Sequence, residues 1–206
     1  MLNYIAGPVR ISLVTFVLCG FVYPLAVTAV GQLAMPYQAN GSVETDGETH
    51  VIGSRLIGQQ WQDPRWFHGR PSATVAADPV DPAITVASPY NAANTTASNL
   101  GPTSQALLDR LTKDRKALER GQPDLGGALL PSDMLTASGS GLDPDITPAN
   151  AALQVTRVAH SRGVPADRIA ALVVEHTTPR SLWIFGEPRV NVLELNLALE
   201  QAFPNN

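Results

Sequence analysis

The chain has 206 residues, a net charge of −4 and a charged fraction of 16%. This acidic balance argues against a basic surface for nucleic acid, so no nucleic-acid partner is expected. Cys19 is the one cysteine in the sequence, so the chain cannot form an internal disulfide. Thiol chemistry is possible at residue 19 alone.

An uncharged stretch separates Arg10 from Glu44, and an apolar run fills residues 11–34. A helix needs roughly 20 mainly apolar residues to cross a bilayer core, and this run is long enough. A cleavable signal peptide would have more positive charge before a shorter apolar core of about 7–15 residues. A buried core helix is the other alternative, but uncharged runs of this length are rare in soluble cores. We predict a retained transmembrane anchor over residues 1–37, with the lipid bilayer as partner. The residues expected to mark it are Ile11, Phe16, Phe21, Pro24 and Val30.

Flanking charge predicts the orientation of this anchor. Lysine and arginine are retained on the cytoplasmic side of a membrane. Arg10 precedes the run, whereas the first charges after it are the acidic residues Glu44, Asp46 and Glu48. We therefore expect a cytoplasmic N-terminus, with the rest of the chain extracytoplasmic. In a bacterial inner membrane that side is the periplasm.

Residues 38–50 are polar and contain glycine, which is typical of a linker, and residues 51–206 are expected to form one soluble domain. The domain should open with a short, glycine-interrupted strand within residues 51–59. Three aromatic residues follow closely and are expected to cover an edge of the core: Trp61, Trp66 and Phe67.

Residues 69–103 show no apolar periodicity and are rich in proline, aspartate, asparagine and small residues. A loop of that length without secondary structure is uncommon in a compact domain. We interpret it as a functional insertion or as a surface that lies over a partner.

An amphipathic helix is predicted over residues 104–120, with Thr103 as N-cap and Gly121 just past its end. Its mixed charges suggest a solvated face rather than a binding patch. Its apolar face should contain Leu107, Leu108, Leu111 and Leu118.

The C-terminal third predicts three more helices and one strand. Thr147 followed by Pro148 is typical of a helix start, and that helix should end at Gly163. The next helix begins near Pro165. The strand is expected at residues 182–185. Asn191 and Glu194 have capping-box spacing, which favours a last helix over residues 192–202, although the alternating leucines there also fit a strand. The predicted fold class is α+β: one transmembrane helix, then a loop-rich, mainly helical domain with a few short strands.

Two segments have residues suited to binding. His68 and Arg70 lie beside a Gly-Pro turn, where they suit anion binding or proton donation, or simply bond to carbonyls. Ser138, Ser140 and Asp143 lie in a glycine-rich segment that leads toward a helix N-terminus, where backbone amides can bind phosphate. These residues include the types needed for a Ser/His/Asp hydrolase site, but the sequence contains no Gly-x-Ser-x-Gly nucleophile motif. The four histidines show no metal-site spacing, and no catalytic residue is predicted.

Five short motifs, in this order and behind an N-terminal anchor, resemble the C-subunit family of the bacterial Kdp potassium-transporting ATPase. They cover nearly the whole chain and lie at residues 53–59, 67–73, 98–103, 135–144 and 186–196.

The resemblance implies a non-catalytic subunit of a high-affinity, ATP-driven potassium uptake complex in the inner membrane. Its implied partners are a channel-like A subunit, a P-type B subunit that hydrolyses ATP and a very small F subunit. The family is described as a catalytic chaperone that raises the ATP affinity of the B subunit. ATP and K⁺ are then handled by the complex, and no cofactor or metal is assigned to this chain. The residues proposed to contact a partner or nucleotide are His68, Arg70, Asn99, Gly101, Ser138, Ser140, Asp143, Arg189 and Asn191.

Two positions depart from the family pattern. Asp145 stands where the family commonly has histidine, and residues 94–97 read Asn-Thr-Thr-Ala where a Ser-Gly-Gly run is common. Direct contact with ATP is therefore in question. ATP is also cytoplasmic, whereas flanking charge places the domain outside. We therefore expect the domain to dock outside on the A subunit through residues 69–103. The alternatives from other classes are an anchored exported hydrolase and an anchored adhesion or scaffold domain.

Overall fold

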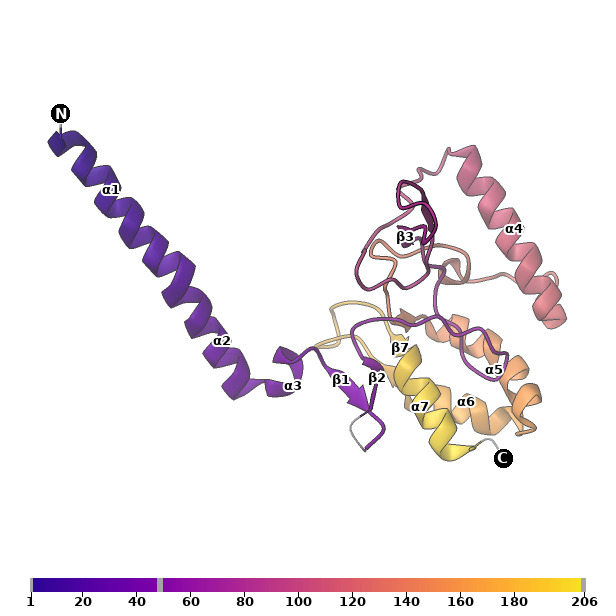
Figure 1. Ribbon diagram of the computed structural model, residues 1–206. Helices are drawn as coiled ribbons and strands as arrows, with labels where there is room; N and C mark the ends of the chain where they lie inside the picture. The colour runs from indigo at the N-terminus through magenta and orange to yellow at the C-terminus, as the bar shows by residue number, and fades with distance from the viewer. Residues whose placement is uncertain (1, 48–49, 205–206) are drawn as a thin grey trace. The chain divides into compact units, whose positions relative to one another are not determined.

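The computed structural model describes residues 2–47 and 50–204 (Figure 1). The chain divides into two compact units, with the boundary in the sequence between Ser54 and Arg55. The first unit begins with one long helix. Its consecutive parts are α1 (Leu2–Val17), a π-helical turn (Leu18–Val22) and α2 (Tyr23–Ala34). Residues 4–34 are long and apolar enough to cross a membrane. The predicted long apolar N-terminal helix is confirmed. Every predicted anchor residue lies in it and is exposed: Ile11, Phe16, Phe21, Pro24 and Val30.

The π-helical turn lies where proline chemistry requires an adjustment. Pro24 has no N–H, and in a regular α-helix its ring would clash with the carbonyl of Gly20. The turn just before it is one residue wider, and the N–H of Tyr23 donates to the carbonyl oxygen of Leu18. Such wide turns are a known way for a helix to absorb a local mismatch. The helix therefore continues past the proline to Ala34.

The rest of the first unit contains a short helix and a two-stranded sheet. Helix α3 (Pro36–Ala39) is followed by β1 (Val43–Thr45) and β2 (Val51–Ser54), which pair antiparallel. The Ser54 hydroxyl donates to the Gly41 carbonyl (2.7 Å). The stretch interpreted as a linker, residues 38–50, thus includes a strand. The strand expected within residues 51–59 is present as β2.

The second unit has its core between three helices and a small sheet. The helices are α5 (Pro148–Arg162), α6 (Ala166–Glu175) and α7 (Val192–Ala202). The strands β5 (Asp145–Ile146), β7 (Arg189–Asn191) and β6 (Thr177–Thr178) form an antiparallel sheet in that order. Phe67 is fully buried among these elements, and Trp61 and Trp66 pack against the same cluster. The predicted aromatic edge of the core is confirmed.

Local capping chemistry explains where these helices begin and end. The Thr147 hydroxyl accepts the Asn150 N–H (3.1 Å) at the start of α5, and Gly163 ends that helix in the left-handed conformation. The Asn191 side chain accepts the Glu194 N–H (3.1 Å) at the start of α7. The last segment is therefore a helix, not the strand that its alternating leucines also allowed.

Helix α4 (Gln105–Gly121) lies apart from the other three helices of its unit (Figure 1). Its N-cap is Ser104, not Thr103 as predicted, because the Ser104 hydroxyl accepts the Leu107 N–H. Gly121 is the last helical residue rather than the residue beyond the end. Three of the four leucines on the predicted apolar face are half-buried, but Leu108 is exposed. Two 3₁₀ turns follow, at Pro123–Leu125 and Ser132–Met134.

Residues 69–103 contain a small antiparallel hairpin of β3 (Val75–Ala77) and β4 (Thr85–Ala87), which the lack of periodicity did not predict. The strand predicted at residues 182–185 is wrong. There the chain makes a tight turn closed by an isolated bridge between Ser181 and Phe185. Strand propensity fails here because Leu182 and Trp183 both have positive φ values, of 51° and 68°.

Candidate functional site

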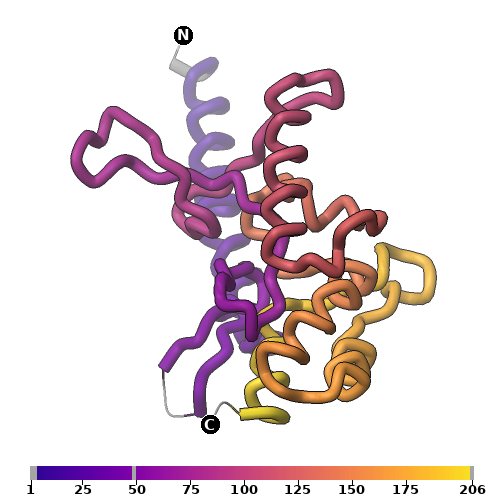
Figure 2. The backbone as a smooth tube through the Cα atoms, turned by 90° about the vertical axis from the view of Figure 1, so that its right-hand side faces the viewer, coloured from indigo at the N-terminus to yellow at the C-terminus, as the bar shows by residue number. Residues whose placement is uncertain are grey.

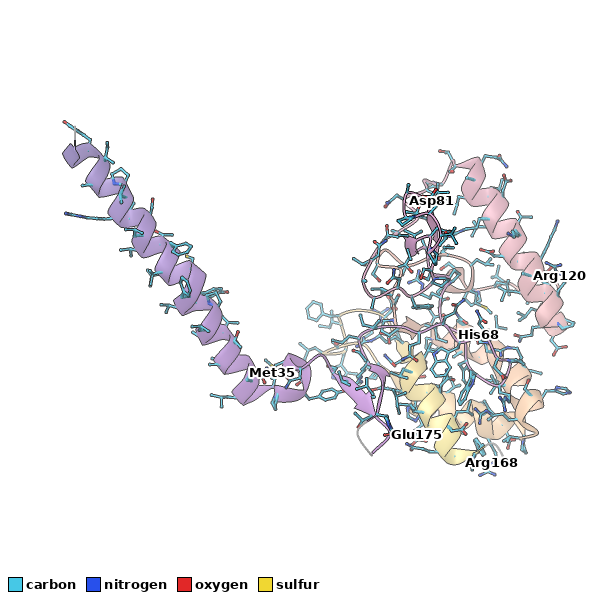
Figure 3. The ribbon with its side chains drawn as sticks, in the orientation of Figure 1. Met35, His68, Asp81, Arg120, Arg168 and Glu175 are labelled. Carbon is cyan, nitrogen blue, oxygen red and sulfur yellow. The ribbon has the colours of Figure 1, made fainter. Side chains whose placement is uncertain are left out.

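A groove beside α4 in the second unit has both apolar and charged walls. Its volume is about 830 Å³, within the range of small-molecule sites. We call it the α4 groove. One wall is α4, and the other is the segment 59–72 with Pro89, Tyr90 and Arg157. Figure 3 labels His68, which belongs to this second wall, and Arg120 near the far end of α4.

Three arginines give the groove a positive character within an acidic chain. They are Arg70, Arg110 and Arg157, and the acidic residue in its lining is Asp114. Arg110 and Asp114 lie one helical turn apart on α4, with 3.9 Å between their nearest charged atoms. A concave surface with one excess sign of charge attracts the opposite sign. Because Arg70 pairs with Asp143 and Arg110 lies near Asp114, the positive charge left over in the lining is that of Arg157.

Arg157 holds the wall of the groove in place through hydrogen bonds. It donates to the carbonyl oxygens of Pro64 (2.6 Å) and Trp66 (3.0 Å) and to the side chain of Gln154 (2.6 Å). Burial lowers the pKa of its guanidinium to about 10. Arg157 thus remains charged near neutral pH and ties α5 to the segment 59–72.

His68 is held between the same elements. Its backbone N–H donates to Gln154 (2.8 Å), and its Nε2 lies 3.1 Å from the carbonyl oxygen of Asp63. Burial first, and the nearby charge of Arg157 second, lower the pKa of the imidazole below its usual value. A neutral ring that donates from Nε2 to the Asp63 carbonyl fits this environment. His68 is thus engaged in holding a turn.

Buried donors without partners gather at the groove. Within residues 2–47 and 50–204, four buried side-chain nitrogens lack a hydrogen-bond partner, and three belong to groove residues: Trp61 Nε1, Arg70 Nε and Arg110 Nε. The fourth is Nη2 of Arg162. An unpaired buried N–H costs roughly 1–3 kcal/mol, so native proteins rarely keep one. Because these nitrogens have almost no exposed surface, an acceptor from outside the chain would reach them only after the groove wall rearranges.

The structure brings Arg70 together with the predicted glycine-rich segment. Arg70 forms an ion pair with Asp143 (2.8 Å), and its guanidinium lies 3.5 Å from the carbonyl oxygens of Thr136 and Ala137. Both side chains of the pair are about three-quarters buried. The carbonyl oxygen of Arg70 accepts the hydroxyl proton of Tyr90 (2.6 Å). Arg70 therefore joins three separate stretches of chain.

Ser138 and Ser140 close their own turn. The Ser138 hydroxyl accepts the Gly141 N–H (2.8 Å), and the Ser140 hydroxyl accepts the Leu142 N–H (3.1 Å). Gly141 has a φ of 70°, and a side chain there would collide with Thr74. The amides of Gly141 and Leu142 are thus engaged inside the chain. His68 makes its contacts with Asp63, Gln154 and Arg157, and not with these hydroxyls. The geometry therefore gives no support to the hypothetical Ser/His/Asp hydrolase site.

The remaining predicted residues lie elsewhere. On β7, Arg189 pairs with Asp145 (3.0 Å), and Asn191 donates to Asp145 (3.2 Å) and to the Arg55 carbonyl (2.9 Å). Burial is the main cause that raises the pKa of Asp145. Asn99, with a φ of 51°, and Gly101 lie in an exposed loop. These residues do not join the α4 groove.

Sequence reasoning missed four residues of the groove wall: Trp61 as a donor, Tyr90, Arg110 and Arg157. Arg110 lies in the mixed charges interpreted as a solvated face. Arg157 was not singled out in its helix, and Tyr90 lies in a segment without any pattern. Among the residues that the structure describes, no group of three histidine, cysteine, aspartate or glutamate side chains could hold a metal ion.

Comparison with known proteins gives one consistent result. The family model described as "K+-transporting ATPase, c chain" matches residues 5–201. A potassium-transporting ATPase KdpC subunit of Rhodopseudomonas palustris is 52% identical over 97% of this chain and 98% of its own length. KdpC subunits of Bradyrhizobium diazoefficiens and Methylobacterium nodulans are 50% and 49% identical, each over 98% of both chains.

Proposed function

Because this chain belongs to the KdpC family, the c chain of K⁺-transporting ATPases, we propose that it is the non-catalytic subunit that docks on and stabilises the potassium-uptake complex. The resemblance seen in the five sequence motifs is thereby confirmed. The proposed partners are a channel-like A subunit, a P-type B subunit that hydrolyses ATP and a small F subunit. The sequence itself contains neither an Asp-Lys-Thr-Gly-Thr phosphorylation motif nor a P-loop. ATP and K⁺ are thus handled by the partners.

We propose that the second unit works on the outer side of the membrane. The long apolar helix with Arg10 before it and Glu44 as the first charge after it supports this orientation. A protease that cleaves a C-terminal tag in intact spheroplasts would support it. Protection of the tag until lysis would overturn it.

The observation that carries the proposal is the set of three unpaired buried N–H donors in the α4 groove. Unpaired buried donors are rare in native proteins, so we expect the wall of this groove to rearrange when a partner docks. Backbone carbonyls or carboxylates of a partner subunit are the acceptors that the groove fits. The segment 69–103 borders the groove through Gly69, Arg70 and Tyr90, so we place the docking surface on both.

Hydrogen bonds hold the segment 69–103 in one shape, as a docking surface requires. The Thr74 hydroxyl donates to the Ser88 carbonyl (2.6 Å), and Thr95 donates to the Ser140 carbonyl (2.8 Å). The turn between β3 and β4 leaves Val80 and Ile84 exposed, beside Asp81, which Figure 3 labels. Exposed apolar side chains on a fixed hairpin are typical of a contact site.

An outer domain raises the ATP affinity of a cytoplasmic site only through a change of state. A partner that binds one conformation of a complex more tightly shifts the whole population toward that conformation. A tenfold gain in affinity corresponds to about 1.4 kcal/mol, which a single docked surface can supply. The chaperone effect therefore needs no contact between ATP and this chain.

The test uses the double variant Val80→Ser with Ile84→Ser in the assembled complex. We expect the KM for ATP of potassium-stimulated hydrolysis to rise several-fold, because docking is weakened. The matched control is Leu129→Ser, which likewise removes an exposed apolar side chain (95% exposed). Leu129 lies outside the hairpin and the groove lining. Unchanged assembly and an unchanged KM in the double variant would remove the hairpin from the docking surface. Arg110→Gln tests the groove separately, with the same readout.

A further inference from the structure

Four consecutive large apolar side chains lie exposed at one tip of the second unit. We call Leu182, Trp183, Ile184 and Phe185 the apolar tip; their exposed fractions are 77%, 91%, 72% and 63%. The tip lies in the connection between β6 and β7, and Figure 2 shows this gold loop projecting from the helices of its unit. Large apolar side chains exposed as one continuous group generally mark an interaction site.

The backbone holds the tip in a fixed outward turn. The N–H of Ser181 donates to the Phe185 carbonyl (2.8 Å), and the N–H of Phe185 donates to the Ser181 carbonyl (2.9 Å). Between them Leu182 and Trp183 adopt the left-handed conformation, which residues other than glycine rarely take. The apolar side chains are therefore presented outward by a closed turn instead of folding back onto the core.

Charge at the base of the tip is neutralised. Arg180 and Glu187 form an ion pair (2.6 Å) across the hairpin, and residues 181–186 contain no charged side chain. On the adjoining strand, Arg189 pairs with Asp145. The tip thus has an uncharged apolar end above a polar base without net charge.

We propose that the apolar tip inserts into the interfacial region of the same bilayer that the N-terminal helix spans. Tryptophan and apolar residues are the side chains that favour this region. The paired base matches the headgroup layer without calling for anionic lipid. The proposal depends on the helix as a membrane anchor and not on the α4 groove or on residues 69–103.

The anchor makes the bilayer the nearest available apolar phase. The 20 residues 35–54 join Ala34 to the second unit. They contain α3 and the antiparallel pair β1 and β2, so their reach is well below the roughly 70 Å of a fully extended chain. Such a tether gives the tip a high effective concentration at the membrane surface. All four successive side chains are mostly exposed, so a partner phase has to cover each of them. A fluid bilayer surrounds all four.

The three tryptophans of the chain make the proposal measurable. Trp61 and Trp66 pack against the core, Trp183 is at the tip, and the anchor contains none. The full chain is reconstituted in phosphatidylcholine vesicles with brominated acyl chains, which quench only tryptophan in contact with lipid. We expect wild type to lose part of its emission and Trp183→Phe to lose none. Leu182→Ser with Ile184→Ser should abolish the quenching while Leu129→Ser keeps it.

Three results would overturn the proposal. Equal quenching of wild type and Trp183→Phe would mean that the signal does not come from the tip. Quenching of Trp183 by aqueous iodide in vesicles, with protection only after the other complex subunits are added, would assign the tip to a protein partner. Protection that depends on the protein-to-lipid ratio would assign it to a second copy of the chain. The proposal also predicts the same result with and without added phosphatidylglycerol, and in 0.05 and 0.5 M salt.

Discussion

Replacing Gly58 with alanine is expected to destabilise the second unit, because two different segments approach this glycine closely. Its N–H donates to the carbonyl oxygen of Leu142 (2.8 Å), which fixes the approach. An added Cβ would lie 2.5 Å from Cε1 of Tyr90 and 2.6 Å from the carbonyl oxygen of Asp143. The tyrosine ring has some freedom to turn, but the carbonyl belongs to a backbone segment held by the ion pair with Arg70.

Overpacking of this kind costs roughly 1–3 kcal/mol. The lost flexibility of glycine in the unfolded chain offsets about 0.4–1 kcal/mol of that cost. The net loss is therefore about 1–2 kcal/mol, which corresponds to a fall in Tm of roughly 2–8 °C for a domain of this size. Tryptophan fluorescence of the full chain in detergent follows the transition, since Trp61 and Trp66 pack against the core.

Gly101→Ala is the matched control, because no atom lies within 4 Å of the position that its Cβ would take. We expect its Tm to equal or slightly exceed that of wild type. A Tm for Gly58→Ala at or above the wild-type value would refute the reasoning, since it would mean that the contact between residues 58 and 143 yields without cost.

Two further predictions concern buried polar groups. The Asp133 carboxylate accepts hydrogen bonds from the N–H (2.7 Å) and hydroxyl (3.1 Å) of Thr147 and from the side-chain amide of Asn150 (3.0 Å). Asp133→Ala should therefore lower the free energy of unfolding by roughly 2–3 kcal/mol. A change in the urea midpoint near zero would contradict this prediction. The lowered pKa of His68, caused by burial and then by the charge of Arg157, means that the unfolded chain takes up its proton first as the pH falls. The contribution of neutral His68 to stability is therefore fully present above pH 6.5, its usual pKa, and is lost as the pH falls below that value. His68→Gln should flatten the plot of unfolding free energy against pH in this range. An unchanged slope of that plot would refute the prediction.

The parts of the fold that local chemistry determines were predictable from the sequence. Thr147 before Pro148 starts a helix, and Gly163 ends it, because each acts on backbone groups within one turn. The Asn191 cap resolved the last segment as helix for the same reason. The long apolar helix was predictable from its length and lack of charge. These signals need no knowledge of distant residues.

The α4 groove was not predictable, since contacts between distant parts of the chain build it. Asn196 bonds to both backbone groups of Phe67 across 129 residues, and Gln154 bonds to both those of His68 across 86. Neither pair leaves a periodic signal in the sequence. The ring of Tyr90 packs where only glycine fits, at positions 58 and 69. The motif around His68 was noted in the sequence, but the contacts that hold its turn depend on these distant partners.

The sequence-based predictions for the apolar tip and for the segment 69–103 failed in opposite ways. Together the two failures point to contacts that the chain does not make within itself. Apolar residues 182–185 predicted a strand because such residues are normally buried, yet the chain itself leaves them exposed. The polar segment 69–103 predicted a loop, yet it contains a hairpin tied down by side-chain bonds. Where local propensity and the fold disagree, functional surfaces are expected. An exposed apolar tip gains free energy when it enters an apolar phase, and unpaired donors gain free energy when they meet acceptors. We propose that the bilayer supplies the first and a partner subunit the second, within the membrane complex for which the family is named.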